Sequence, residues 1–439
     1  MEQTFYLLLA ILIPLSVVVF ILTEFDILHP VSIVTFVMTA SAFLAATKIE
    51  QWHLPMSINA SLLIVTSLIC FITGGLWVDW RIKKNLNGIP VKKDCCEYFI
   101  SNSGILLMSL TVLLLAYFQY REFYDGSVML GNHSGPFDFS SMIKTIRPSV
   151  ERETFKFSRW FFYRFYFVQG IVFCSLFVFF TRSIQGNYRL EFRRNMKYLI
   201  PLLFSLVFLL CDTGRKLPLD FLLFCLLTGA IIFQIRNHFS VKGKLYIILV
   251  CAVCGLFFLM VFLALGTLSG KVSAGGQSFY EILVHYMGLS MPAFSVFLEQ
   301  VRAENPYIGS TTLFGIYSNL NRLGAGLPPV RLFQPFVYFK GVDTNVYTMM
   351  ARYITDYGFI GMHLIMAFIG MFYAAFYDYI RFISKKTEWI AYYGYLPFTL
   401  FFAMNEEHFL IQVLTTATLY NFVLFYLVFK VFVHRTATD

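Results

Sequence analysis

The chain has 439 residues, of which 58% are hydrophobic, 19% are aromatic and only 13% are charged. Soluble domains carry about 25% charged residues, so this composition excludes an ordinary soluble protein and predicts an all-α, polytopic membrane protein. The formal net charge is +9, and we use the basic residues to orient the chain in the membrane rather than to infer a nucleic-acid partner.

Stretches of about 20 mostly apolar residues are long enough to cross a bilayer as a helix. The chain offers about eleven, at residues 5–23, 29–47, 57–78, 100–119, 159–180, 196–212, 217–235, 243–266, 353–380, 389–404 and 408–433. Two connections are long, residues 120–158 and residues 267–350, and the others are short. We therefore expect one integral membrane domain, residues 1–439, with two long exported loops.

Lysine and arginine gather in alternate short loops. The basic residues of these loops are Arg81, Lys83, Lys84, Lys92 and Lys93; Arg182, Arg189, Arg193, Arg194 and Lys197; Arg236, Lys242 and Lys244; Arg381, Lys385 and Lys386; and Lys430 and Arg435. Because short cytoplasmic loops are rich in Lys and Arg, we expect these loops on the cytoplasmic side. Both long loops, the turn 211–217, the tetrad 405–408 and the N-terminus then face the outer side.

The loop 267–350 is rich in aromatic and turn-forming residues, which predicts a folded structure against the membrane surface rather than a disordered linker. One segment within it, residues 279–298, is nearly long enough to span the bilayer. It contains Glu281, His285 and Pro292, and counting it as a span would place the basic loop 381–386 outside. We therefore expect a surface or re-entrant helix there.

Two cysteines, Cys251 and Cys254, have the spacing of a redox or metal pair. They lie inside an apolar stretch, where small side chains commonly serve helix or lipid contacts. We therefore predict no metal site and no cofactor. Neither long exported loop contains a cysteine, so no disulfide is expected in them.

Arginines recur at the outer membrane boundaries: Arg215 in the tight turn CDTGRKLP, Arg322 and Arg331 in the long loop, and Arg352 where the next span begins. A single arginine at a membrane boundary is typical of an interfacial anchor. Together they predict an anionic ligand, because a guanidinium grips phosphate oxygens in a bidentate fork. For Arg215 the following helix would add its positive dipole end and free N–H groups, and a short polar hairpin turn is the alternative reading.

The stretch NVYTMMARYITDYGFIG, residues 345–361, places Arg352 and Asp356 four residues apart on one helix face. An ionised side chain at the bilayer centre costs roughly 2.5 to 3.5 kcal/mol, so this pair needs a compensating role. It is either a neutralised pair at the membrane edge or a catalytic pair. In the catalytic reading the carboxylate takes a hydroxyl proton while the arginine holds phosphate.

Other outer-side residues compete for the role of base. They are Asp343 in the long loop and the adjacent group Glu406, Glu407 and His408. Two neighbouring carboxylates at the mouth of a span suit proton transfer. Capping of the helix expected to start at His408 is the alternative for that group.

Several short motifs resemble one family. They are the turn ending in Thr213-Gly214-Arg215, the segment TTLFGIYSNLNRLG at residues 311–324, and Asn345-Val346-Tyr347-Thr348 followed by Asp356-Tyr357-Gly358-Phe359-Ile360-Gly361. With the string of spans and the long outer loop, they resemble the bacterial oligosaccharide repeat-unit polymerases of O-antigen and capsule synthesis. The family turn commonly reads Thr-Gly-Ser-Arg, whereas Gly214 directly precedes Arg215 here.

This resemblance implies a metal-independent glycosyltransferase with a GT-C-like, multi-span architecture in the bacterial inner membrane. Its active site would face the periplasm and move a growing glycan from undecaprenyl diphosphate onto an incoming lipid-linked repeat unit. Arg215, Arg322 and Arg331 would then bind diphosphate. Asn345, Tyr347 and Tyr353 would contact sugar, although an interfacial belt is the alternative for any single tyrosine. Membrane lipids and optionally a chain-length regulator protein would be partners.

Three other functions remain open at this stage. A ligase would transfer the same lipid-linked glycan to a lipid A core, and it would also need arginines to bind the lipid diphosphate. A flippase for lipid-linked sugars should instead place polar residues near the bilayer midplane, with internal repeats, whereas here the polar residues crowd the outer boundary. A structural or receptor role leaves the arginines and carboxylates unexplained.

Overall fold

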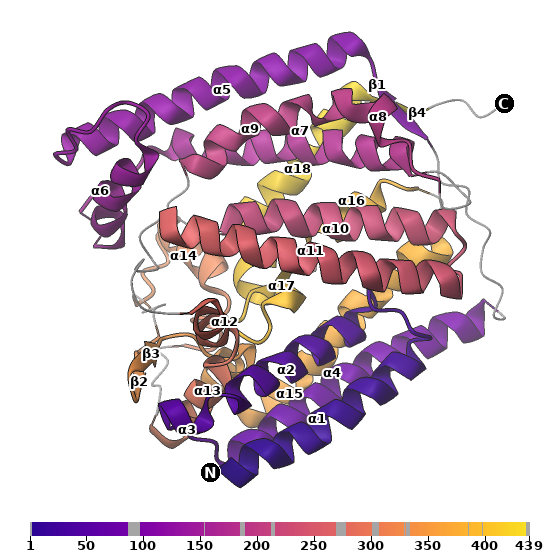
Figure 1. The fold of residues 1–439 in the computed structure, drawn as a ribbon, viewed down its shortest axis with the longest axis vertical. Coiled ribbons are helices and arrows are strands. Elements are labelled where there is room, and N and C mark those ends of the chain that lie inside the picture. The colour runs from indigo at the N-terminus through magenta and orange to yellow at the C-terminus, as the bar shows by residue number, and fades with distance from the viewer. Residues whose placement is uncertain are drawn as a thin grey trace. The chain divides into compact units, whose positions relative to one another are not determined.

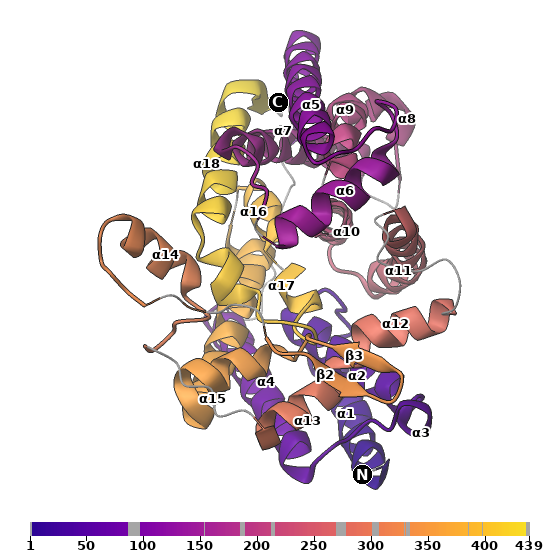
Figure 2. The same cartoon turned by 90° about the vertical axis from the view of Figure 1, so that its left-hand side faces the viewer.

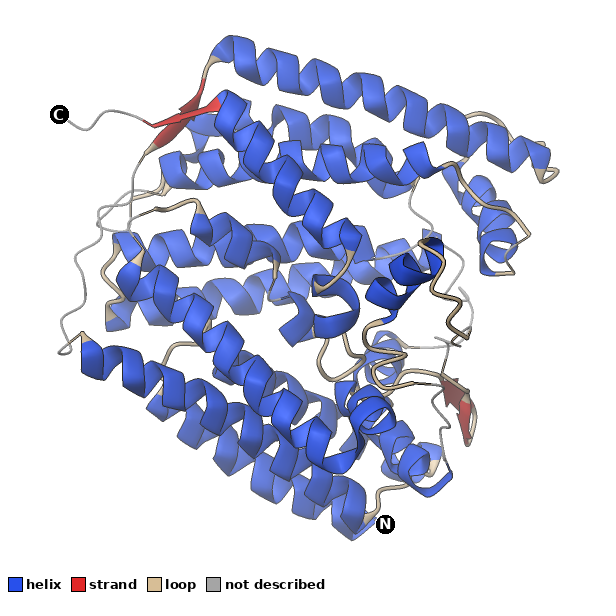
Figure 3. Ribbon diagram, turned by 180° about the vertical axis from the view of Figure 1, so that it is seen from behind, coloured by secondary structure: helices blue, strands red, loops and turns tan. Residues whose placement is uncertain are grey.

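The computed structural model describes residues 2–86, 97–152, 154–184, 189–211, 216–268, 278–300, 307–328, 330, 334–384, 386–396 and 398–435. These residues are mostly helical, and their four short strands form two separate two-stranded ribbons (Figure 3). The chain divides into two compact units, each assembled from separate segments. Unit 1 comprises Met1–Val91, Ser278–Ser384 and Leu396–Thr418, and unit 2 comprises Lys92–Gln277, Lys385–Tyr395 and Leu419–Asp439.

Unit 1 is built around long helices from both ends of the sequence (Figure 1). Its elements are α1 (Glu2–Leu22), α2 (Pro30–Ala46), α3 (Ile49–Trp52), α4 (Ile58–Asn85), α12 (Phe279–Met287), α13 (Ser290–Gln300), α14 (Phe314–Arg322), β2 (Val337–Phe339), β3 (Val342–Thr344), α15 (Met349–Asp378), the π-helical turn η2 (Tyr379–Ile383), α17 (Phe398–Phe401) and the π-helical turn η3 (Phe409–Val413). The antiparallel β2–β3 hairpin lies beside α12 and α13 (Figure 2).

Helices α4 and α15 pack at very short range, and glycines make this possible. A Cβ added to Gly74 would lie 2.3 Å from the carbonyl oxygen of Ala367, and one added to Gly370 would lie 2.1 Å from that of Phe71. Small residues at a helix interface allow backbones to approach in the membrane, where no hydrophobic effect drives the helices together. The α4–α15 pair is therefore the part of unit 1 least tolerant of added volume.

We expect Gly370→Ala to lower the thermal unfolding midpoint of the purified protein, because the new methyl group overlaps backbone that cannot rotate away. Overpacking of this kind costs about 1 to 3 kcal/mol. Gly255→Ala is the matched control, since Gly255 lies in a helix with nothing within 4 Å of its added Cβ. An unchanged midpoint in Gly370→Ala would show that the two helices separate freely.

Unit 2 contains the remaining elements. They are β1 (Tyr98–Ile100), α5 (Asn102–Met129), α6 (Phe139–Glu151), α7 (Arg159–Ser183), α8 (Phe192–Asn195), the 3-10 turn η1 (Met196–Leu199), α9 (Ile200–Leu210), α10 (Lys216–Arg236), α11 (Val241–Leu268), α16 (Trp389–Tyr395), most of α18 (Thr416–Phe432) and β4 (Val433–Arg435). Strands β1 and β4 pair antiparallel, with Tyr98 opposite Arg435. Its core includes the stacked rings of Phe173 and Phe224, 3.9 Å apart between centroids.

Seven helical segments in the described part of the chain are long and apolar enough to cross a bilayer. They are Gln3–Leu22, Ile58–Asn85, Asn102–Met129, Arg159–Ser183, Pro218–Arg236, Tyr280–Glu299 and Met349–Ile383, and two shorter apolar helices are Pro30–Ala46 and Thr416–Phe432. The prediction of a mostly helical protein is therefore confirmed, and these helices have the length and composition expected of a multi-pass membrane protein. The expected number of spans stays a prediction.

Some expected segment bounds need correction. Residues 389–404 do not form one helix, because α16 ends at Tyr395 and α17 covers only Phe398–Phe401. The segment 408–433 is likewise divided into η3 and α18. Helix α5 continues to Met129, so the first long loop begins later than residue 120 and contains α6. The expected surface or re-entrant helix at 279–298 is a pair of helices, α12 and α13, whose combined segment also has the composition of a span.

Candidate functional site

A polar cluster lies at the N-terminal turns of α15, within unit 1. The capping residue Thr348 begins the helix with an extended backbone, φ −61° and ψ 155°. Arg352 and Asp356 are each 6% exposed and Tyr353 is fully buried. These side chains meet two loops, residues 307–313 before α14 and residues 402–408 between α17 and η3. The expected placement of Arg352 and Asp356 on one helix face is confirmed, and the structure adds that both side chains are buried.

Arg352 pairs with a carboxylate from the second loop. Its Nη2 contacts Oε1 of Glu406 as a salt bridge and hydrogen bond. The side chain of Arg352 is 7% exposed, whereas that of Glu406 is 41% exposed. The pair therefore joins a buried cation to an anion that remains open to solvent.

Asp356 instead holds the first loop. Its Oδ2 accepts hydrogen bonds from the N–H and hydroxyl of Thr312, at 2.7 and 2.6 Å, and from the N–H of Thr311 at 3.2 Å. The hydroxyl of Thr312 also lies 2.8 Å from that of Tyr357. A carboxylate whose lone pairs are engaged in this way is poorly placed to take a proton from a substrate. The geometry therefore favours Asp356 as a loop anchor over Asp356 as the base.

The neighbouring carboxylate, Glu407, is fully buried. It accepts hydrogen bonds from the hydroxyl of Tyr353 at 2.8 Å, the N–H of Leu410 at 2.6 Å and the N–H of Ile411 at 2.9 Å. Two of these donors belong to the start of η3, so the alternative reading of this acidic group as a helix cap holds for Glu407. Burial raises the pKa of its carboxyl to about 7, and the three hydrogen bonds act in the opposite direction.

This raised pKa makes stability depend on pH. The unfolded carboxyl ionises near pH 4.5 and the folded one near pH 7, so the folded state binds more protons between these values. Stability therefore falls as pH rises from about 5 to about 7, by up to about 3 kcal/mol. We expect the thermal midpoint of the wild type to fall over this range more steeply than that of Glu407→Gln. Parallel curves for the two proteins would contradict the buried, proton-binding carboxyl.

The other predicted site residues have the following surroundings. Asp343 is exposed on β3, and Arg322 is exposed in the last turn of α14. Asn345 is half-buried in the chain between β3 and α15. His408 stacks edge-on against Phe402, with ring centroids 5.6 Å apart.

The tyrosine predictions need correction. Tyr347 is 1% exposed and donates a hydrogen bond to the carbonyl of Pro335 at 2.8 Å. Tyr353 is fully buried and donates to Glu407. Neither ring has a free face, so neither can stack on a sugar in this structure. Arg215 and Arg331 lie outside the described residues, and their diphosphate-binding role stays a prediction.

Sequence reasoning assigned no role to Thr311, Thr312 or Tyr357. Their signal was present, because two adjacent threonines open the segment TTLFG, and Tyr357 follows Asp356 directly. What the sequence lacked was any indication that residues 311 and 356 lie in contact, since 45 residues separate them.

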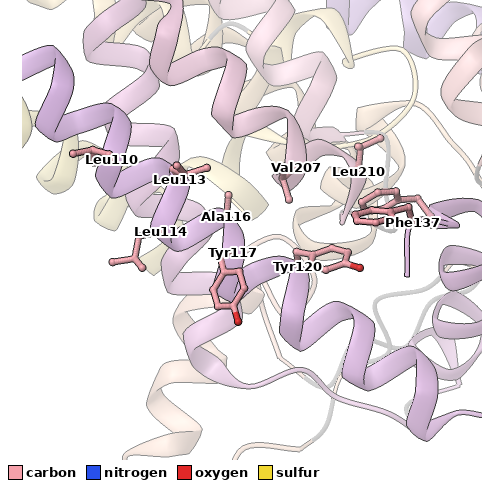
Figure 4. Close-up of a pocket in the computed structure, with 10 residues that line it drawn as sticks. Leu110, Leu113, Leu114, Ala116, Tyr117, Tyr120, Phe137, Val207 and Leu210 are labelled. Carbon is pink, nitrogen blue, oxygen red and sulfur yellow. The ribbon is translucent and has the colours of Figure 1, made fainter. Parts of the chain in front are cut away.

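Unit 2 has an apolar groove of about 730 Å³ along α5 (Figure 4). Its lining residues are Leu110, Leu113, Leu114, Ala116, Tyr117, Tyr120, Phe137, Phe139, Val207 and Leu210. The rings of Tyr120 and Phe137 stack with centroids 6.3 Å apart. Such a lining suits a hydrocarbon chain and offers little to a polar ligand.

Comparison of the chain with models of protein families, with curated proteins and with solved structures finds no match.

Proposed function

We propose that this protein is a bacterial inner-membrane glycosyltransferase that polymerises oligosaccharide repeat units carried on undecaprenyl diphosphate, at the periplasmic face. The observation that supports this best is the pair formed by buried Arg352 and solvent-open Glu406. A buried guanidinium held by an exposed carboxylate is a place where a more highly charged anion from solution can replace that carboxylate. The family resemblance supports the identity of this anion as a lipid diphosphate.

In this proposal Glu406 pairs with the guanidinium of Arg352 only when no substrate is bound. A diphosphate presents several oxygens to the planar fork of Arg352, with more charge than one carboxylate. Its arrival displaces Glu406, whose side chain is then free to accept a proton from a sugar hydroxyl. Binding of the donor thereby switches on the base.

The transfer step balances with these two residues. The hydroxyl oxygen of the incoming unit forms a bond to the anomeric carbon while the bond from that carbon to the diphosphate oxygen breaks. The hydroxyl proton moves to Glu406, and Arg352 stabilises the negative charge left on the diphosphate. Asp356 and Glu407 hold the two loops in place during the step.

The product pattern of a bacterial strain lacking this protein tests the proposal. We expect a lipid A core capped by a single repeat unit, because addition of further units would stop while ligation continues. Uncapped core with accumulated lipid-linked polymer would identify a ligase instead. Unchanged long-chain polysaccharide would contradict both transfer functions.

A further inference from the structure

A second polar cluster lies inside unit 1, away from Arg352. It comprises His29, the N-cap residue of α2; Asp79, near the end of α4; and Asp378, the last residue of α15. One possible ligand atom from each residue lies within 4.8 Å of the others. The three residues are 1%, 6% and 0% exposed. The close α4–α15 contact places these carboxylates together, although about 300 residues separate them along the chain.

In the described part of the chain, four possible ligand atoms of this cluster receive no hydrogen bond from a protein donor. Both carboxylate oxygens of Asp378, Oδ1 of Asp79 and Nε2 of His29 are buried without a hydrogen bond to any part of the chain that the structure describes. Burying an ionised carboxylate without compensation is expensive. A bound cation would satisfy all of these acceptors at once.

The surrounding groups are already engaged with one another. Asp26 accepts from the N–H of Leu28 at 3.0 Å and from the hydroxyl of Tyr377 at 2.6 Å. Lys83 binds Glu24 at 2.8 Å and Oδ2 of Asp79 at 3.0 Å. Arg381 binds Glu24 at 3.3 Å and lies 4.0 Å from Asp26.

These contacts define the local charge. The buried carboxylates of Asp26, Asp79 and Asp378 and the half-exposed carboxylate of Glu24 lie near two cations, Lys83 and Arg381, which leaves a formal excess of two negative charges. A divalent ion would make the cluster neutral.

We propose that His29, Asp79 and Asp378 bind one divalent transition-metal ion of the Mn²⁺, Fe²⁺ or Zn²⁺ class. One imidazole nitrogen with carboxylate oxygens is a donor set that suits these ions. The Nδ1 of His29 accepts a long hydrogen bond, 3.3 Å, from the N–H of Val31. Coordination through Nε2 moves the ring proton to Nδ1 and gives up only this contact.

The metal has a structural role in this proposal. Arg352 and Asp378 lie near opposite ends of α15, and the 20 residues that follow the break at Gly358 alone span about 30 Å. The ion would therefore take no part in glycosyl transfer, and the proposal does not depend on the proposed function. It joins α2, α4 and α15 at one end of unit 1.

Metal titration of the full-length purified protein tests this site. After treatment with EDTA and desalting, we expect the wild type to bind one Mn²⁺ per chain, followed as loss of the free Mn²⁺ signal in electron paramagnetic resonance. Asp378→Asn and His29→Gln should each weaken binding by at least about 10-fold. Asp125→Asn, which removes an exposed carboxylate of α5 in unit 2, should bind as the wild type does.

A second readout keeps the test decisive if a variant folds poorly. Mn²⁺ should raise the thermal midpoint of the wild type and of Asp125→Asn, and leave that of His29→Gln nearly unchanged. Absence of Mn²⁺ and Zn²⁺ binding to the wild type would overturn the proposal, and would mean that Asp79 and Asp378 take protons instead. Equal affinity in wild type and Asp378→Asn would overturn it as well.

Discussion

Arg352→Lys is expected to abolish long-chain polysaccharide while the protein still inserts into the membrane. Lysine keeps the positive charge that Glu406 pairs with, but it lacks the planar fork that binds two phosphate oxygens together. Losing one preorganised donor to developing charge costs about 2.7 to 4 kcal/mol, or roughly 10² to 10³ in turnover. The measurement is the length distribution of polysaccharide in a deletion strain that expresses the variant, with turnover of lipid-linked repeat units by purified protein.

Two further variants belong to this experiment. Arg121→Lys is the matched control. Arg121 is exposed on α5, and its ion pair with Asp125 is long, at 3.8 Å, and open to solvent. Glu406→Gln removes the proposed base and also the anion that competes with the diphosphate. We therefore expect Glu406→Gln to lower kcat and KM together. Normal chain length in Arg352→Lys, or a raised KM with normal kcat in Glu406→Gln, would contradict the exchange of carboxylate for diphosphate.

Asp356→Asn is expected to reduce both stability and turnover, because it removes the charge that holds the loop 307–313. The variant loses charge-assisted hydrogen bonds to two N–H groups and one hydroxyl, each worth about 1.5 to 3 kcal/mol. These losses overlap, so we expect a total of about 2 to 4 kcal/mol. Chemical or thermal unfolding of the purified protein measures it.

Thr312→Val separates an anchoring role of Asp356 from a catalytic one. If Asp356 anchors the loop, Thr312→Val lowers stability and turnover as Asp356→Asn does, and the double variant costs less than the two single losses combined. If Asp356 is instead the base, Asp356→Asn loses turnover at normal stability while Thr312→Val keeps its activity. That second pattern would refute the anchoring assignment.

Composition and periodicity were sufficient to predict the helical membrane fold and the shared face of Arg352 and Asp356, because both depend on residues close in sequence. The pairing of Arg352 with Glu406 was not predictable in this way, since 54 residues separate the two and the sequence offered Asp356, four residues away, as the partner of Arg352. Packing decides among them, and packing is absent from a hydropathy profile.

The broken segment at 389–404 has a similar cause. Hydropathy averages over a window, so it combines α16 and α17 into one apolar stretch. The buried tyrosines were misassigned because an aromatic residue near a membrane boundary has the same sequence signal whether it faces sugar, lipid or protein. The hydroxyl groups of Tyr347 and Tyr353 donate hydrogen bonds to Pro335 and Glu407 inside unit 1, so both side chains face protein.

Gly358 interrupts α15 directly after Tyr357, with φ 69° and ψ −176°. An added Cβ there would meet nothing within 4 Å, so the requirement for glycine is conformational and not steric. In an unbroken helix each residue turns by a fixed angle, and the direction of Asp356 would dictate the direction of every later side chain. The interruption resets that rotation. The first turns can therefore point their ionic groups inward, and the side of the remaining helix that faces lipid is set separately.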